Sequence, residues 1–135
     1  MQFKPTQNEL DTFSKMKAAE RMQYFLSRTI EAEEVWGIND YAGWVLRDIG
    51  DNVVLQVWPY KQLCSDYIIS QSESYMPGAV SIEHFVDNLL QIMMEQDIDI
   101  DIFPTKEANG IRIKAAELYE ILNNMLESGE YYMEG

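Results

Sequence analysis

Three short apolar runs between residues 35 and 58 constrain the fold more than any other feature of the sequence. They read VWGI (35–38), GWVLRDI (43–49) and NVVLQVW (52–58), and each is rich in the β-branched and aromatic residues that favour strands. The polar loops between them are too short to carry the chain from one end of a strand back to the other, so neighbouring strands have to be antiparallel. The region therefore predicts a three-stranded antiparallel meander.

Large aromatic residues accompany this meander. Trp36, Trp44 and Trp58 lie within 23 residues, and Tyr60 follows two positions later. Such residues usually form the core of a small sheet, but they would also suit a ligand pocket. The polar stretch SQSESYMPGA (70–79) predicts an irregular, mobile loop that would close such a pocket. From the sequence alone, both interpretations stay open.

Helical periodicity surrounds the meander. Apolar residues recur at helical spacing in five segments, several of which begin at a capping residue or a proline. The segments are 7–16, a second helix from Ala18, a third from Pro59, a fourth capped by Ser81 and a fifth at 115–128. Cys64 lies in an apolar stripe, where burial should keep a thiol protonated and unreactive. His84 lies on the polar side of the fourth helix.

Together these elements predict an α+β fold. We expect a small antiparallel sheet, made of the three-stranded meander plus one or two further strands, packed with about five helices. The run IRI (111–113), after the turn dipeptide Asn-Gly, is one such further strand. The length fits one core, so residues 1–135 are expected to form a single domain. Residues 1–17 would be a short helical segment, and 130–135 a flexible tail.

The stretch EQDIDIDIFP spaces three aspartates, Asp97, Asp99 and Asp101, two residues apart, like the first ligands of a calcium-binding loop. That loop also requires glycine at its sixth position and glutamate at its twelfth, which are Ile102 and Ala108 here. The alternation with isoleucine instead predicts a half-buried strand whose aspartates face solvent. An acidic protein-binding edge and a divalent ion completed by other loops are the remaining alternatives.

The charge of the chain limits its partners. It has 10 basic and 23 acidic residues, a formal net charge of −13, which argues against nucleic acid because phosphate binding needs clustered Lys and Arg. Residues 1–30 are mildly basic, so the negative charge lies in residues 31–135 and suits a basic protein partner. No apolar run approaches the ~18 residues of a membrane span, and the start lacks a signal segment, which predicts a cytoplasmic protein.

Several short motifs, in their order and spacing, resemble a family of small bacterial proteins, the domain-of-unknown-function family 2750. The motifs are YFL (24–26), EEVWGI (33–38), GW (43–44), VWP (57–59), SIEHF (81–85) and IFP (102–104). The likeness spans about residues 18–126. It implies a bacterial cytosolic protein of α+β fold and transfers no catalytic or binding residue.

These observations lead to competing hypotheses about function. We expect a non-enzymatic, acidic protein-interaction module that binds a basic protein, with the three aspartates as its acidic face. The alternative is a small-ligand-binding protein that uses a pocket at the three tryptophans and Tyr60. An enzyme is the third and least favoured hypothesis, because a single cysteine and a single histidine leave few residues for a nucleophile–base pair. A homodimer through an unpaired strand is also compatible, and no cofactor or metal is predicted.

Overall fold

In the computed structural model, which describes residues 16–69, 71–106 and 109–128, the three apolar runs predicted between residues 35 and 58 form four strands, because the run 43–49 divides at Val45. The strands are β1 (Glu34–Asp40), β2 (Gly43–Trp44), β3 (Leu46–Ile49), β4 (Asn52–Trp58), β5 (Met76–Ser81), β6 (Asp99–Ile102) and β7 (Ile111–Ile113). The helices are α2 (Ala18–Ala32), α3 (Lys61–Ile68), α4 (Ile82–His84), α5 (Leu90–Glu95) and α6 (Ala115–Ser128), with the π-helical segment η1 (Phe85–Leu89) between α4 and α5.

The helices begin close to where the sequence predicts. Ser81 caps the predicted fourth helix, because its Oγ accepts a hydrogen bond of 3.1 Å from the backbone N–H of His84. The second and last predicted helices are also confirmed, as α2 and α6. The predicted first helix (7–16) and tail (130–135) fall on residues outside the described ranges, except for Met16, which is not helical.

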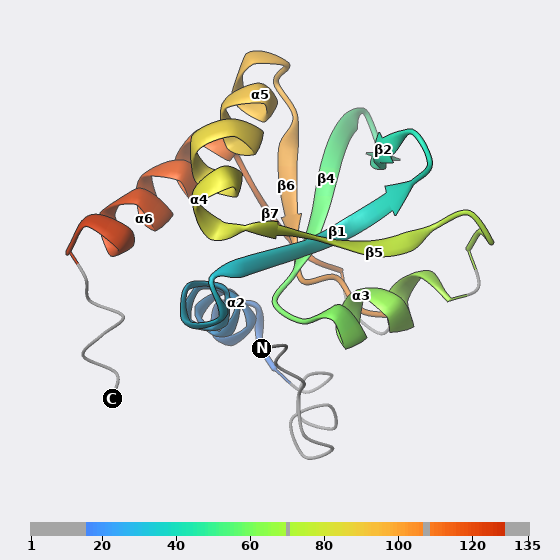
Figure 1. The fold of residues 1–135 in the computed structure, drawn as a ribbon, viewed down its shortest axis with the longest axis horizontal. Helices are drawn as coiled ribbons and strands as arrows, with labels where there is room; N and C mark the ends of the chain where they lie inside the picture. The colour runs from blue at the N-terminus through green and yellow to red at the C-terminus, as the bar shows by residue number, and fades with distance from the viewer. Residues whose placement is uncertain (1–15, 70, 107–108, 129–135) are drawn as a thin grey trace.

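The strands form one mixed sheet (Figure 1). Its order is β5-β1-β4-β6-β7, and β2 and β3 pair with the parts of β1 and β4 that diverge from each other. Every pairing is antiparallel except that of β4 with β6, which is parallel. The α+β prediction is therefore confirmed, but the sheet is not purely antiparallel. A parallel pair needs a long crossover, which the chain makes through α3, β5 and the helices from α4 to α5.

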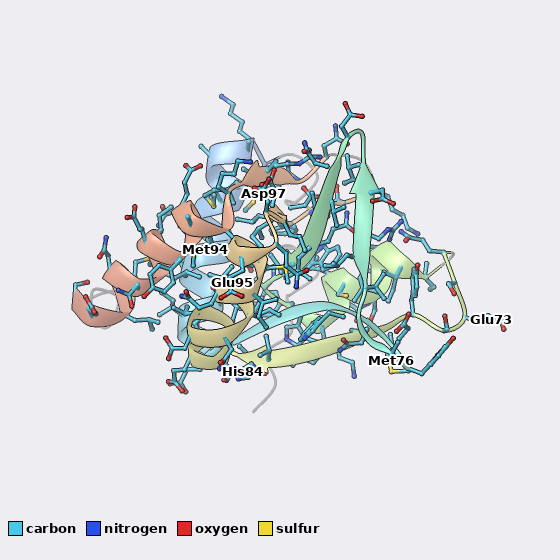
Figure 2. All side chains as sticks on the ribbon, turned by 90° about the horizontal axis from the view of Figure 1, so that it is seen from above. Glu73, Met76, His84, Met94, Glu95 and Asp97 are labelled. Atoms are coloured by element: carbon cyan, nitrogen blue, oxygen red, sulfur yellow. The ribbon has the colours of Figure 1, made fainter. Side chains whose placement is uncertain are left out.

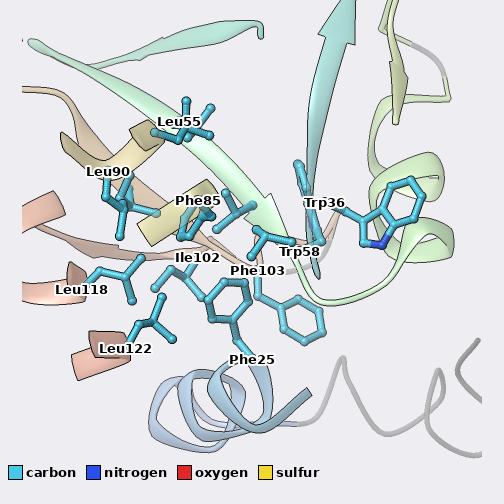
Figure 3. Close-up of a cluster of buried hydrophobic side chains, with 14 of the residues drawn as sticks. Phe25, Trp36, Leu55, Trp58, Phe85, Leu90, Ile102, Phe103, Leu118 and Leu122 are labelled. Atoms are coloured by element: carbon cyan, nitrogen blue, oxygen red, sulfur yellow. The ribbon is translucent and has the colours of Figure 1, made fainter. Parts of the chain in front are cut away.

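One face of the sheet carries the main hydrophobic core. The register places Leu55 beside Ile100 and Val57 beside Ile102, so these side chains share a face, and all four are buried. Figure 3 shows buried side chains of α2, η1, α5 and α6 converging with Leu55 and Ile102. They include Phe25, Phe85, Leu90, Leu118 and Leu122. The isoleucines of the DIDIDI stretch thus lie in the core, as the alternation predicts.

The aspartates point to the opposite face, which is also covered. Asp99 and Asp101 are only 7% and 4% exposed, so the prediction that they face solvent is wrong. The reason is that β6 is an interior strand and α3 packs on the second face of the sheet, where Tyr67 meets Gln56 of the neighbouring strand β4. Asp97 is exposed, but it precedes the strand and has a left-handed backbone, with φ of 55°.

The predicted irregular loop 70–79 is partly wrong. Its second half belongs to β5, which pairs with β1 over six residue pairs from Glu34–Ser81 to Asn39–Met76. Pro77 and Gly78 make this strand difficult to predict from the sequence, because both residues are rare in strand interiors. A proline is tolerated here because, in the part of the chain that the structure describes, β5 pairs with β1 alone and leaves its other edge open.

The single cysteine is a core residue. Cys64 is fully buried in α3, and its thiol donates a weak hydrogen bond of 3.4 Å to the carbonyl of Gly37. Burial raises the pKa of the Cys64 thiol to about 12, so the reactive thiolate is not formed at neutral pH. The predicted inert character of this residue follows from its position.

Gly37 makes room for the ring of Trp44. A Cβ atom at position 37 would lie 2.7 Å from Cζ3 of Trp44, much closer than a carbon–carbon contact allows. Two of the motifs that mark the sequence, Trp36-Gly37 and Gly43-Trp44, are therefore in contact with each other. Their spacing reflects the way the β2 segment folds back over β1.

We predict that Gly37→Ala lowers the free energy of unfolding by about 1–3 kcal/mol, because the new methyl group overpacks against Trp44. Urea denaturation measures this. The matched background is Trp44→Ala, in which the ring is absent and Gly37→Ala should cost far less. Equal costs in the two backgrounds would show that the two residues are not in contact.

Candidate functional site

A pocket of about 290 Å³ opens on the aspartate side of β6, and we call it the Asp101 pocket. Its lining comes from the end of β3, from α3, from the segment after β6 and from β7. The lining residues are Ile49, Tyr67, Asp101, Pro104, Thr105, Asn109, Gly110 and Arg112. Ligand pockets commonly measure roughly 300–1,000 Å³, so this one suits a small molecule.

Asp101 supplies the most unusual group of the pocket, a carboxylate that is 4% exposed. Its Oδ2 accepts a hydrogen bond of 3.0 Å from Nε2 of Gln56, which is the residue beside it in the parallel pair of strands. Gln56 is itself 2% exposed, and its Nε2 also donates to the hydroxyl of Tyr67 at 3.2 Å. Within the described residues the carboxylate of Asp101 forms no other hydrogen bond, so its Oδ1 is not engaged.

The amide of Gln56 leaves a second acceptor unused. Its Oε1 is fully buried and has no hydrogen-bond partner among the described residues. A buried acceptor without a partner costs about 1–3 kcal/mol, and buried polar groups are rarely left in this state. Of the two oxygens that lack a donor here, only Oδ1 of Asp101 belongs to a residue that lines the pocket.

Two aspartates of β6 face cations across the β6–β7 pair, but only one forms an ion pair. Oδ1 of Asp99 lies 3.1 Å from Nζ of Lys114, and this hydrogen bond raises the pKa of Lys114. Asp101 lies directly opposite Arg112, yet among the residues described no ion pair involves either of them. The pocket thus contains a carboxylate and a guanidinium group that do not neutralise each other.

Buried donors fix the wall of the pocket. Arg21 of α2 is 5% exposed, and its guanidinium donates hydrogen bonds to the carbonyls of Phe103, at 2.9 Å, and Asn109, at 2.7 Å. Nε1 of Trp58 donates to the carbonyl of Pro104 at 2.8 Å. The segment after β6 is therefore held at three carbonyls by side chains far away in the sequence, and its position does not depend on a ligand.

Two further contacts shape the pocket. The ring of Trp58 packs against the ring of Tyr67, with 5.1 Å between centroids, and supports it from behind. A Cβ atom at position 110 would overlap Oδ1 of Asp101, so only glycine lets the β7 side approach the carboxylate this closely. The predicted Asn109-Gly110 turn dipeptide thus has a role in the site as well as in the chain reversal.

The aromatic residues predicted to bind a ligand do not line this pocket. Trp36, Trp58 and Tyr60 are buried, and Trp36 pairs with Trp58 across β1 and β4. Trp44 is half-buried and lies over Gly37, on the opposite face of the sheet from Trp36. The four residues therefore do not all lie on one face of the sheet, and their role in ligand binding stays a prediction.

The three predicted partner-binding aspartates are also separated. Asp97 is exposed in the turn before β6, Asp99 pairs with Lys114, and Asp101 lies in the pocket. Their role in binding a partner stays a prediction, but they do not form one acidic face. In the described part of the chain, no group of three or more His, Cys, Asp or Glu residues could hold a metal ion.

Sequence reasoning missed the residues that complete the site. Gln56 had a signal, because it is the only polar side chain in the run VVLQVW, and a lone amide in a buried strand needs a partner. Arg112 had a weaker one, since it lies two positions from Lys114 on the same face of the chain. No local sequence pattern indicated Tyr67 or Arg21, because their hydrogen-bond partners are 11 and 82 residues away in the sequence.

The chain was compared with known families and proteins. No helix in the described ranges is long and apolar enough to cross a membrane. No curated protein matches the sequence. Residues 22–122 match a family model described as "Protein of unknown function (DUF2750)", and this match includes every residue that lines the Asp101 pocket. Because the match covers most of the chain, the protein belongs to the DUF2750 family.

Proposed function

We propose that the protein binds a small polar ligand in the Asp101 pocket. The observation that carries this proposal is the Asp101 carboxylate, which is 4% exposed, lines a pocket and is bonded only to a neutral amide within the described residues. A buried charge is costly unless it is paired, so a donor from a bound molecule would compensate for a real energetic deficit.

The lining supports binding more than chemical conversion. It offers a carboxylate, a guanidinium group and a phenol, which together recognise a ligand through hydrogen bonds and charge. The side chains best suited to nucleophilic or general-base chemistry, Cys64 and His84, lie elsewhere. Cys64 is buried under β1, and His84 is exposed on the α4 side of the molecule in Figure 2.

This proposal moves the predicted ligand site. The tryptophans were the predicted lining, whereas the pocket lies beside them and uses Trp58 only as a support for Tyr67 and Pro104. The aromatic cluster thus belongs to the scaffold of the site. The polar residues on β4, β6 and β7 supply its chemistry.

We predict that a thermal-shift screen of small polar metabolites finds a stabilising compound. At a ligand concentration of 100 times Kd the stabilisation is about 2.7 kcal/mol, or roughly 10 °C for a chain of this size. The shift should disappear in Ile49→Trp, which fills the pocket from the end of β3, and persist in Leu46→Trp, an exposed position of the same strand outside the lining. A hit that survives Ile49→Trp, or a screen without hits, would contradict the proposal.

A second candidate function is supported by an acidic helical layer. The exposed carboxylates of this layer lie on or beside α4, η1, α5 and α6: Glu83, Asp87, Glu95, Asp97, Glu117, Glu120 and Glu127. The segments 82–97 and 115–128 contain no Lys or Arg at all. Figure 2 shows Glu95 and Asp97 on this side, far from Glu73 and Met76 at the other end of the molecule. A surface of one sign steers a partner of the opposite sign, so this layer supports the predicted interaction with a basic protein.

Neutralising the acidic helical layer should abolish capture of a basic partner from a cell lysate. The layer variant combines Glu83→Gln, Asp87→Asn, Glu117→Gln and Glu120→Gln. The matched control removes four exposed carboxylates elsewhere, with Asp48→Asn, Asp51→Asn, Asp66→Asn and Glu73→Gln. We expect the control to retain the partner at low salt and the wild type to lose it at moderate salt. Equal retention by both variants would exclude the layer as the binding surface.

A further inference from the structure

The geometry points to a zwitterion of the α-amino-acid type as the ligand of the Asp101 pocket, with its ammonium group at Asp101 and its carboxylate at Arg112. This inference rests on the proposed function and specifies its ligand class. It follows from the two charges that the pocket holds apart, from the acceptors that have no donor, and from the size of the cavity.

The Asp101 side of the pocket requires hydrogen-bond donors. A carboxylate can accept about four hydrogen bonds, and Asp101 accepts one, from Gln56. Gln56 is bonded to two lining residues, Asp101 and Tyr67, but it does not line the pocket and its own Oε1 is fully buried. An ammonium group carries three donors and a positive charge, so it matches the unused acceptor positions of the Asp101 carboxylate and compensates for the buried negative charge.

The Arg112 side suits an acceptor with negative charge. The side chain of Arg112 is exposed at the pocket and, within the described ranges, has no carboxylate partner and no hydrogen bond. Its guanidinium group presents a planar set of donors that fits a carboxylate with two parallel bonds. Asp99 and Lys114, one step along the same strand pair, do form an ion pair, at 3.1 Å.

Only a ligand with both charges satisfies both sides. A simple amine would place a second cation near Arg112, and a simple carboxylate would place a second anion near Asp101. Asp101 and Arg112 lie directly opposite each other in an antiparallel pair, where Cβ atoms are about 5 Å apart, so one small molecule can contact both side chains. An α-amino acid, whose two charged groups are attached to one carbon atom, is such a molecule.

The rest of the lining fits the remainder of such a molecule. Ile49 and Pro104 supply apolar contact, and the hydroxyl of Tyr67 accepts from Gln56 while its own proton is not used by any described residue. A volume of about 290 Å³ lies at the lower end of the range for small-molecule pockets and accommodates a single amino acid.

The test measures binding of the twenty free amino acids to the full chain by isothermal titration calorimetry. Each is compared with its N-acetyl derivative, which lacks the ammonium group, and with its amide, which lacks the carboxylate. We expect at least one free amino acid to bind and each blocked form to bind at least tenfold more weakly. This comparison uses only the wild-type protein, so it does not depend on a variant that folds.

Two variants assign the charges. Asp101→Asn should bind the free amino acid at least tenfold more weakly than wild type does and should no longer distinguish it from its N-acetyl form. Arg112→Gln should also bind the free amino acid at least tenfold more weakly and should no longer distinguish it from its amide. Asp97→Asn and Arg28→Gln remove the same charges outside the pocket and should leave affinity unchanged.

The possible results distinguish a failure of the zwitterion as ligand from a failure of ligand binding in the Asp101 pocket. If no free amino acid binds, or if a blocked form binds as well as the free one, the zwitterion is overturned. A metabolite of another class that binds wild type and is blocked by Ile49→Trp would still leave the proposed function standing. If that screen also finds nothing, both fall.

Discussion

The parallel pairing of β4 with β6 is the constraint on which the rest of the structure depends. It makes β6 an interior strand with both faces covered, so the isoleucines enter the core on one side and two aspartates are buried on the other. Buried carboxylates need partners, which Lys114 supplies for Asp99 and Gln56 supplies in part for Asp101. Because Asp101 accepts only the hydrogen bond from Gln56 within the described residues, its carboxylate can accept further hydrogen bonds from a ligand, and this makes the pocket a candidate binding site.

Local patterns in the sequence predicted the local parts of this fold. The strands of region 35–58, the strand Ile111–Ile113 and helices α2 and α6 follow from periodicity and turn chemistry within a few residues, whereas the direct pairing of β1 with β4 is not part of the predicted meander. The parallel pair could not be predicted in this way, because it joins segments about 45 residues apart. Alternation in the DIDIDI stretch showed that the strand has two faces, but not that both faces are covered. Strand β5 was missed because Pro77 and Gly78 break the usual strand composition.

The site was less predictable than the fold, since most of its contacts join distant residues. Gln56 meets Asp101 across 45 positions, and Arg21 holds Phe103 across 82. The motifs that mark the DUF2750 resemblance have clear structural roles: Trp44 lies over Gly37, and Trp58 binds the carbonyl of Pro104. These motif residues form the sheet and the wall of the pocket, so the resemblance predicts the fold of the protein. The class of ligand is instead inferred from polar residues that lie outside the motifs.

The most direct test of this account is a double-mutant cycle on Gln56 and Asp101. If the two side chains are a buried, bonded pair, Gln56→Leu and Asp101→Leu should each lower the free energy of unfolding by about 1–3 kcal/mol, because each leaves a buried polar group without its partner. The double variant should lose less than the sum of the two by at least about 1 kcal/mol. Effects that add to within about 0.5 kcal/mol would show that Asp101 faces solvent and that the pocket has no buried charge.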